Sequence, residues 1–311
     1  MSAAVEHITI VGAGRVGASL AVDLAPLTRF GSVTVVGRRP APPPLLAGRG
    51  DVGYREIAVG GALPDPLLPE RTGAAVLLFC VPDDALAGLA ARWGRELASS
   101  RGAPRLALHT SGVHPAAVLA PLRSAGAAIA GWHPLLALAG PRQGAFRSAT
   151  FGVEGDDEAT AWGSELAREL GARVVRVRPE AKALYHAAAV FGANYVVACL
   201  SVAADLLDRS LETEPGPQEV PPDRALRALL PLVRSAVENV AAAGLRAGVT
   251  GPIVRTDVET VRGHLDTLDP ATRALYRALG AALLRSRGAG PSDDEAYARL
   301  RQLLEADEGR G

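Results

Sequence analysis

Three glycines near the start of the chain constrain its folding more than any other feature. The segment HITIVGAGRVGASLA, residues 7–21, places Gly12, Gly14 and Gly17 between a strand-like run and an amphipathic, helix-like run. In such a unit the first glycine allows a tight turn, and the third lets the helix pack closely against the strand. The second leaves the backbone open to an anion at the helix N-terminus. The segment predicts a phosphate-binding turn, with a purely structural turn as the alternative.

Strand-like and helix-like stretches alternate through the first half of the chain. Helices are expected at 15–27, 84–99, 115–124 and 156–170. Strands are expected at 7–14, 32–39, 74–81, 105–112, 127–134, 150–155 and 173–177. The stretch 74–81 is apolar apart from its thiol, as in a strand buried on both faces of a parallel sheet. The rhythm predicts an α/β fold: a doubly wound parallel sheet of the Rossmann type, with right-handed crossovers.

The alternation stops near Arg178, where we place a domain boundary between residues 1–178 and 179–311. One helix of about 30 residues is expected from Pro179 onward, about 45 Å long at the standard rise. The acidic, proline-rich stretch 212–223 predicts an exposed loop, and the remainder is helical, at 224–243 and in shorter pieces over 257–306. The second domain is therefore expected to be all-α.

Composition narrows the class of protein. Lys+Arg and Asp+Glu both number 33, so no net charge attracts the chain to nucleic acid or to a membrane surface. The N-terminus lacks the pattern of a signal peptide, and Cys80 and Cys199 lie inside apolar runs, which favours inert thiols in a reducing cytoplasm. The apolar stretch 187–207 is long enough to span a membrane. We predict a buried helix instead, because the stretch contains Asn194.

The end of the second expected strand indicates which dinucleotide would bind. Folds that bind NAD usually carry an acidic residue there to hold the ribose hydroxyls. This chain has Arg38 and Arg39 instead. Guanidinium groups bind a 2′-phosphate, which a carboxylate would repel. NADP is therefore favoured over NAD, and the alternative is that both arginines are ordinary solvated charges.

Further motifs carry a resemblance to known families. The stretch CVPDDAL, residues 80–86, resembles the β-hydroxyacid dehydrogenase superfamily, in which this loop borders the nicotinamide ribose. GWHPL, residues 131–135, is similar to the corresponding region of prephenate dehydrogenases. Lys182 opens the long helix where 6-phosphogluconate and hydroxyisobutyrate dehydrogenases place their catalytic lysine.

A narrower resemblance covers nearly the whole chain. HTSGVHP, GWHPL, KALYHAAAVFGANY and TGPIVRTD together resemble a bacterial family that joins a Rossmann-like domain to a helical C-terminal domain of unknown function. The resemblance implies a 6-phosphogluconate dehydrogenase-like C-terminal domain. It also implies an NADP-dependent or deazaflavin-dependent oxidoreductase. We also expect a homodimer through this domain, as in the resembled superfamily, because a helix of about 30 residues with apolar faces on most sides exceeds what one small domain can cover. The substrate does not carry over, because His186 stands where the hydroxyacid dehydrogenases have Asn and GWHPL replaces their glycine-rich substrate motif.

These observations define two sets of candidate site residues. The cofactor set follows from the glycine turn, the arginines and the loop after the fourth expected strand. It comprises Gly12, Gly14, Arg15, Val16, Gly17, Arg38, Arg39, Val81, Pro82 and Asp83. The catalytic set contains polar groups near the expected carboxyl edge of the sheet or on the long helix. It comprises Lys182, His186, His133 and Ser111.

Each catalytic candidate has a structural alternative. Lys182 and His186 stand one helical turn apart and could assist hydride transfer, or could be a solvent-facing charge and a packed histidine. His133 and Ser111 could contact substrate, or could pack and cap a helix. Weaker candidates share these two interpretations. They are His109, Thr110, His114, Asn194, Arg255 and Asp257.

The sequence thus predicts a cytoplasmic, homodimeric, NADP-dependent oxidoreductase that acts on a small carbonyl, imine or hydroxyacid. The histidines lack the spacing of metal ligands, so no metal is expected. Two alternatives stay open. One is a catalytically silent NADP-binding sensor or partner protein, and the other is a deazaflavin-linked NADP reductase.

Overall fold

The computed structural model describes residues 6–57, 75–98, 104–212, 223–287 and 295–306 of the chain. Nearly all of the loop expected at 212–223 lies outside these residues. The chain divides into two compact units, Met1–Asn194 and Tyr195–Gly311. The first unit thus extends beyond the boundary that we place at Arg178, because the first part of the long helical segment packs on the sheet.

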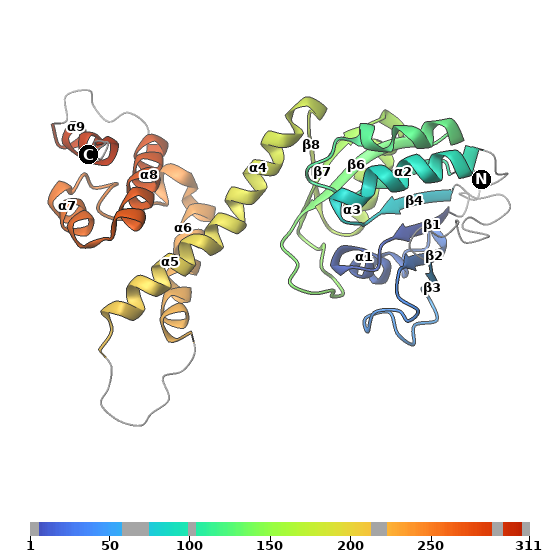
Figure 1. The fold of residues 1–311 in the computed structure, drawn as a ribbon, viewed down its shortest axis with the longest axis horizontal. Helices are drawn as coiled ribbons and strands as arrows, with labels where there is room; N and C mark the ends of the chain where they lie inside the picture. Colours follow the sequence, from blue (N-terminus) through green and yellow to red (C-terminus); the bar gives the residue numbers. More distant parts are fainter. Residues whose placement is uncertain (1–5, 58–74, 99–103, 213–222, 288–294, 307–311) are drawn as a thin grey trace. The chain divides into compact units, whose positions relative to one another are not determined.

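The described part of the first unit contains one eight-stranded sheet (Figure 1). The strand order is β3-β2-β1-β4-β5-β6-β7-β8. The strands are β1 (Glu6–Val11), β2 (Phe30–Gly37), β3 (Gly53–Glu56), β4 (Ala75–Phe79), β5 (Leu106–His109), β6 (Ala128–Leu135), β7 (Thr150–Gly155) and β8 (Arg173–Arg176). The short edge strand β3 was not expected from the sequence.

The prediction of a parallel sheet is right for every neighbouring pair except β6 and β7, which run antiparallel. Two parallel neighbours need a long crossover, usually a helix, whereas an antiparallel pair does not. The connection over residues 136–149 contains no helix. The chain therefore returns beside β6 in the opposite direction, and β8 then pairs parallel to β7 through the helix between them.

Helices cover both faces of this sheet (Figure 1). On one face α1 (Arg15–Leu24) and α3 (Asp157–Glu169) pack against alternate strand residues such as Ile8 and Ile10. On the other face α2 (Asp83–Ala98) and η1 (Ala116–Ala125) pack against Leu77 and Phe79. The doubly wound architecture is thus confirmed. The segment η1 is a 3-10 helix rather than the expected α-helix, and Pro121 within it has no N–H to donate.

The single helix expected after Arg178 is wrong in detail. The segment begins with a 3-10 turn, η2 (Pro179–Ala181), and continues as α4 (Lys182–Gly192) and α5 (Asn194–Ser210). Ala193 breaks the helix with φ −127° and ψ −67°. The residue before the break, Gly192, has low helix propensity.

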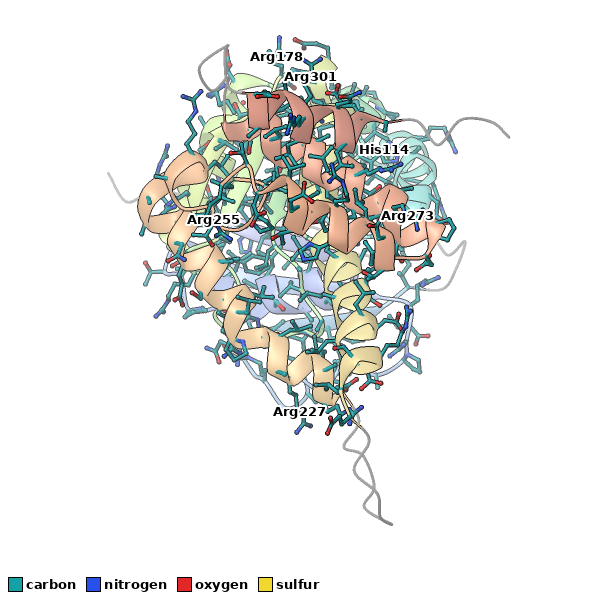
Figure 2. All side chains as sticks on the ribbon, turned by 90° about the vertical axis from the view of Figure 1, so that its left-hand side faces the viewer. His114, Arg178, Arg227, Arg255, Arg273 and Arg301 are labelled. Atoms are coloured by element: carbon teal, nitrogen blue, oxygen red, sulfur yellow. The ribbon has the colours of Figure 1, made fainter. Side chains whose placement is uncertain are left out.

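The second unit is all-α in its described part. It contains α5, α6 (Arg224–Ala247), α7 (Val258–Thr267), α8 (Pro270–Arg287) and α9 (Glu295–Glu305). Its core joins α7, α8 and α9 through buried residues such as Val261, Leu284 and Leu300. Arg273 of α8 (Figure 2) donates hydrogen bonds to the carbonyls of Leu265 and Leu268. These bonds satisfy backbone acceptors at the end of α7.

Two further features of the helical segments bear on the predictions. The stretches Pro179–Ser210 and Arg224–Ala247 are long and apolar enough to cross a membrane. No residue in the most apolar window of either stretch is buried in the single chain, so the buried helix predicted over residues 187–207 is not found there. Asp257 caps α7, because its carboxylate accepts hydrogen bonds from the backbone N–H and hydroxyl of Thr260. Arg255 lies just before this cap (Figure 2).

Candidate functional site

The glycine turn has the local geometry that its sequence predicts. Gly12 adopts φ +113°, and a Cβ atom there would overlap the carbonyl oxygen of Cys80. A Cβ on Gly17 would overlap the carbonyl oxygen of Gly12, so this glycine lets α1 pack close to the turn. Gly14, the N-cap of α1, has no atom within 4 Å of an added Cβ. The backbone at the helix N-terminus is therefore open on its outer side.

This turn lies at the edge of a cleft of about 1110 Å³ in the first unit. Its walls come from the turn after β1, the end of β2 with the proline-rich segment after it, and the start of α2. Seven residues of the predicted cofactor set line the cleft. They are Gly12, Gly14, Arg15, Arg38, Arg39, Val81 and Pro82. A cleft between the carboxyl ends of parallel strands is the usual ligand position in open α/β sheets.

The remaining three residues of that set do not line the cleft. Val16 packs against the core below α1, and Gly17 serves the close packing of the helix. Asp83 begins α2, and its carbonyl oxygen lies 3.1 Å from Nε2 of His114. This contact joins the loop after β4 to the loop after β5.

The arginines after β2 stand exposed on the cleft wall. The hydroxyl of Tyr54, from β3, donates a 2.7 Å hydrogen bond to the carbonyl oxygen of Arg39 and so holds this turn in place. The lining contains one carboxylate, Asp84, at the start of α2 rather than beside the arginines. The end of β2 is thus suited to a phosphate. Arg15, the other arginine of the cleft that belongs to the predicted cofactor set, instead donates a hydrogen bond to the carbonyl oxygen of Leu138.

A buried ion pair fixes the start of α4 to the sheet. Lys182 Nζ lies 3.5 Å from Glu154 Oε1 on β7, and the two side chains are 3% and 2% exposed. The same carboxylate oxygen accepts a 2.7 Å hydrogen bond from the backbone N–H of Ala116 at the start of η1. Burial lowers the pKa of Lys182, and Glu154 opposes that shift. Burial likewise raises the pKa of Glu154, against the effect of Lys182.

The adjacent turn of α4 brings a tyrosine and a histidine to the end of β6. His133 Nδ1 lies 2.9 Å from the hydroxyl oxygen of Tyr185. The ring of His186 stands 6.5 Å from that of His133, centroid to centroid. Both imidazoles adjoin Gly112, where an added Cβ would come 2.9 Å from His133 Nε2 and 2.7 Å from His186 Cδ2. Burial, followed by the charges of Lys182 and His186, lowers the pKa of His133 to about 4.

The loop after β5 uses its polar groups largely for its own turn. Ser111 Oγ accepts hydrogen bonds from the backbone N–H groups of Val113 and His114. His109 is fully buried, and its Nδ1 accepts the Ser111 N–H at 3.1 Å. Burial, followed by the positive charge of Lys182, lowers the pKa of His109 to about 3. Thr110 donates a hydrogen bond to the carbonyl oxygen of Phe79 on β4. These contacts match the capping alternative for this turn.

The structure thus separates the residues predicted as catalytic. His133 and His186 come together beside Gly112, whereas Lys182 points into the buried pair with Glu154. Two residues of this cluster were missed. Glu154 is an acid at a buried position of an otherwise apolar strand, and Tyr185 lies one turn after Lys182 on α4; both are signals of a functional or structural partner.

Other candidates lie elsewhere. Asn194 is exposed at the first residue of α5 rather than buried. Burial raises the pKa of the Cys80 thiol to about 12, so this cleft-lining thiol stays protonated and unreactive. Within the described residues, no group of three or more His, Cys, Asp or Glu side chains is placed to hold a metal ion.

Comparisons with known proteins agree with this architecture. Residues 149–283 match the family model of a domain of unknown function, DUF2520. A search of the curated proteins found no match. Among solved structures, the chain is similar to BF3122 from Bacteroides fragilis, provisionally described as an NADP oxidoreductase. The TM-score is 0.63 at 23% identity, and the match covers 91% of this chain and 98% of that one.

Two more distant structures share the fold over most of their length. Pyrroline carboxylate reductase from Plasmodium falciparum, solved with NADP bound, gives a TM-score of 0.51 at 11% identity, covering 96% of this chain and 98% of that one. A reductive aminase from Aspergillus terreus, solved with NADPH and ethyl-5-oxohexanoate, gives 0.51 at 18% identity, covering 97% and 93%. The chain therefore has the fold of a Rossmann domain followed by a helical C-terminal domain, as its sequence motifs predict.

Proposed function

We propose that the protein is an NADP-dependent oxidoreductase, which transfers a hydride between the nicotinamide and a small carbonyl, imine or hydroxyacid substrate. The observation that carries this proposal is the cleft in which an open glycine turn faces two arginines at the end of β2. The bare backbone at Gly14 suits a pyrophosphate, and the α1 N-terminus offers it N–H groups. Arg38 and Arg39 suit the 2′-phosphate that distinguishes NADP from NAD.

The fit of the cleft to a dinucleotide extends along the sheet edge. Val81 and Pro82 line the cleft beyond the glycine turn, where the resembled superfamily holds the nicotinamide ribose. The contact between His114 and Asp83 links this loop to the loop that contains Ser111 and Gly112. His133 and His186 adjoin that second loop, and they are the residues we assign to the substrate.

The positions of these residues assign separate roles to the cofactor and to the side chains of the protein. The nicotinamide, when bound, supplies or accepts the hydride at the substrate carbon. The chain orients both partners at the carboxyl edge of the sheet and offers a hydrogen-bond donor where negative charge develops on the substrate. Lys182 contributes its charge from within the buried pair, close to both His133 and His109.

The cofactor test is a comparison of affinities. Calorimetry should show NADPH binding at least tenfold tighter than NADH, a difference of about 1.4 kcal/mol. The double variant Arg38→Ala/Arg39→Ala should narrow that gap and leave NADH affinity nearly unchanged. Arg105→Ala, a surface arginine paired with Glu158 outside the cleft, is the matched control. Equal affinities for the two dinucleotides in the unmodified protein would remove the argument for NADP.

The second candidate is a catalytically silent NADP-binding protein. The burial of Lys182 favours it, because the matching lysine of the resembled dehydrogenases is catalytic, whereas Lys182 is buried in an ion pair with Glu154. Turnover separates the two. NADPH oxidation is measured with a panel of ketones, aldehydes and cyclic imines, and with an oxidised deazaflavin as a further acceptor. Tight NADPH binding without oxidation by any of these would support the silent protein.

A further inference from the structure

The contact between His133 and Tyr185 determines which nitrogen of the histidine is left for a substrate. Nδ1 points to the tyrosine hydroxyl at 2.9 Å. Nε2 lies on the Gly112 side of the ring, where the absence of a side chain lets the imidazole pack against the loop, since an added Cβ would come 2.9 Å from Nε2. His133 is half-buried, and Tyr185 occupies its Nδ1. A substrate atom that hydrogen-bonds this ring therefore uses Nε2, so the position of the single proton on neutral His133 decides which kind of atom can bind there.

The surroundings of Tyr185 place the proton of this contact on its oxygen. Its hydroxyl oxygen lies against Gly152, and burial raises the pKa of Tyr185 to about 12, so the oxygen keeps its proton near neutral pH. The hydroxyl proton is then available to His133 Nδ1. A phenol is a more acidic hydrogen-bond donor than a neutral imidazole, so the arrangement with O–H as donor and Nδ1 as acceptor is favoured. Neutral His133 must then carry its own proton on Nε2.

Neighbouring charges support a neutral ring. His133 is desolvated, and the positive charge of Lys182 acts on it. Lys182 Nζ also lies 5.5 Å from the centre of the Tyr185 ring. The same ammonium group that disfavours an imidazolium would stabilise negative charge on the tyrosine oxygen.

We propose that Tyr185 holds His133 in the Nε2–H tautomer, and that the two form a proton relay to the oxygen of a ketone or aldehyde substrate. The proposal rests on the oxidoreductase function proposed above and narrows its substrate class. Tyr185 acts through His133 and is a positioning and relay residue.

The proton and electron balance of the step is simple. The reduced nicotinamide delivers a hydride to the carbonyl carbon, and the C=O π pair moves onto the oxygen. His133 gives its Nε2 proton to that oxygen, while Nδ1 takes the hydroxyl proton of Tyr185. An alkoxide is a stronger base than a phenolate, so the transfer runs toward the alcohol. The phenolate, whose ring lies 5.5 Å from Lys182 Nζ, is short-lived because burial disfavours its charge, and it regains a proton from water.

This tautomer discriminates between substrate classes. A carbonyl oxygen has lone pairs that accept the Nε2–H bond, and the bond strengthens as negative charge develops. A protonated iminium nitrogen has no lone pair and itself needs an acceptor, which an Nε2–H group does not provide. The reverse tautomer would present a bare Nε2 and would reverse this preference.

The test is the ¹⁵N NMR spectrum of the histidine side chains in the full chain, which reports each nitrogen as protonated or bare. His133 should show a bare Nδ1 and a protonated Nε2 near pH 7. Tyr185→Phe should shift His133 toward a mixture of tautomers. The matched control is Tyr276→Phe, since Tyr276 contacts His264 Nδ1 at the same 2.9 Å in the second unit. That change should leave His133 unaffected.

Three results would overturn the inference. The first is a proton on Nδ1 in the unmodified protein, which decides the question even if the variant does not fold. The second is an unchanged tautomer in folded Tyr185→Phe. The third is turnover of cyclic imines in preference to ketones and aldehydes. For a carbonyl substrate, Tyr185→Phe should lower kcat on the order of 10²-fold with NADPH affinity unchanged. Failure to bind NADPH would reject the proposed function, and the NMR result would stand separately.

Discussion

Lys182 and Glu154 form an ion pair that is almost completely removed from solvent, with 3.5 Å between Nζ and Oε1. The pair joins three elements, because Glu154 lies on β7, Lys182 begins α4, and the same carboxylate holds the first N–H of η1. Gly131 on β6 makes the pair possible, since a Cβ there would overlap the carboxylate and come 3.1 Å from Nζ.

Breaking this pair should destabilise the first unit strongly. Glu154→Gln removes the opposite charge and leaves an ammonium group buried, which typically costs about 3–5 kcal/mol. Replacing both residues, as in Lys182→Met/Glu154→Gln, should cost considerably less than the sum of the single changes Lys182→Met and Glu154→Gln. Urea unfolding of the four proteins in the cycle measures this coupling.

The surface pair of Arg105 and Glu158, on the same unit, provides the comparison, and its removal should cost at most about 1 kcal/mol. Additive losses at Lys182 and Glu154 would contradict a coupled pair. If the folded double variant binds NADPH but turns over no substrate, Lys182 has a catalytic role beyond the pair.

Two glycines of the first turn should respond differently to the same substitution. Gly12→Ala forces a Cβ into the Cys80 carbonyl at a φ of +113°, so it should lower the melting temperature of the first unit. Gly14→Ala meets no atom within 4 Å and should leave stability nearly unchanged. It should nevertheless weaken NADPH binding, because the methyl group keeps the pyrophosphate away from the backbone.

Thermal unfolding and calorimetry on both variants test this separation of roles. Gly88→Ala is a control for an added methyl in open space on α2. NADPH affinity that is unchanged in Gly14→Ala would mean that this turn is structural.

The first unit should lose stability in mild acid. The pKa of His133 is lowered to about 4 and that of His109 to about 3, both mainly by burial. Between pH 6.5 and about 4, the unfolded chain binds protons at these sites that the folded chain does not. The free energy of unfolding therefore falls as pH falls through this window. The stabilising contribution of the two neutral histidines is fully present above the window.

Each histidine should contribute on the order of 1–2 kcal/mol between pH 7 and pH 5. Urea unfolding at the two pH values gives the difference. The variant His109→Gln should be less stable than the unmodified protein at both pH values. The difference between its free energies of unfolding at pH 7 and pH 5 should, however, be smaller than in the unmodified protein. If this difference is as large in the variant as in the unmodified protein, His109 is accessible to protons in the folded state.

The parts of the fold that follow from local sequence were predictable. Gly12 and Gly17 have the geometry that their spacing implies, and the strands with continuous apolar runs lie in the middle of the sheet. The antiparallel β6–β7 pair could have been anticipated, because no helix is expected between residues 134 and 150, and a parallel neighbour usually needs one in its connection. The break at Ala193 follows Gly192, a single glycine that lowers helix propensity but does not by itself show where a helix ends.

The site was predictable as an edge of the sheet but not as a set of contacts. His133 and His186 were expected there, and they adjoin Gly112. The partner of Lys182 could not be read from the chain, because Glu154 lies on a strand that joins the sheet in the unexpected direction. The tyrosine contact of His133 depends on the same register, in which Gly152 stands opposite His133 and leaves room for the Tyr185 hydroxyl.

The last prediction concerns assembly. Large apolar side chains on α6 are exposed in the single chain: Leu232 by 66%, Val237 by 62% and Leu245 by 68%. On α4 the same holds for Leu184, at 72%. Large apolar side chains left exposed over several turns of a helix indicate a surface that packs against protein. We expect a homodimer that buries these helices, with its contact centred on the helical second unit.

Light scattering at micromolar concentration should give twice the chain mass of 32.0 kDa. Leu232→Glu/Val237→Glu should shift the protein to monomer, because each buried carboxylate would lack a partner. Arg227→Glu, a change of charge on the same helix (Figure 2), is the control and should leave the mass unchanged. A monomeric unmodified protein would contradict the prediction. A dimer that persists in the double variant would mean that the contact lies elsewhere, with α4 the next helix to test.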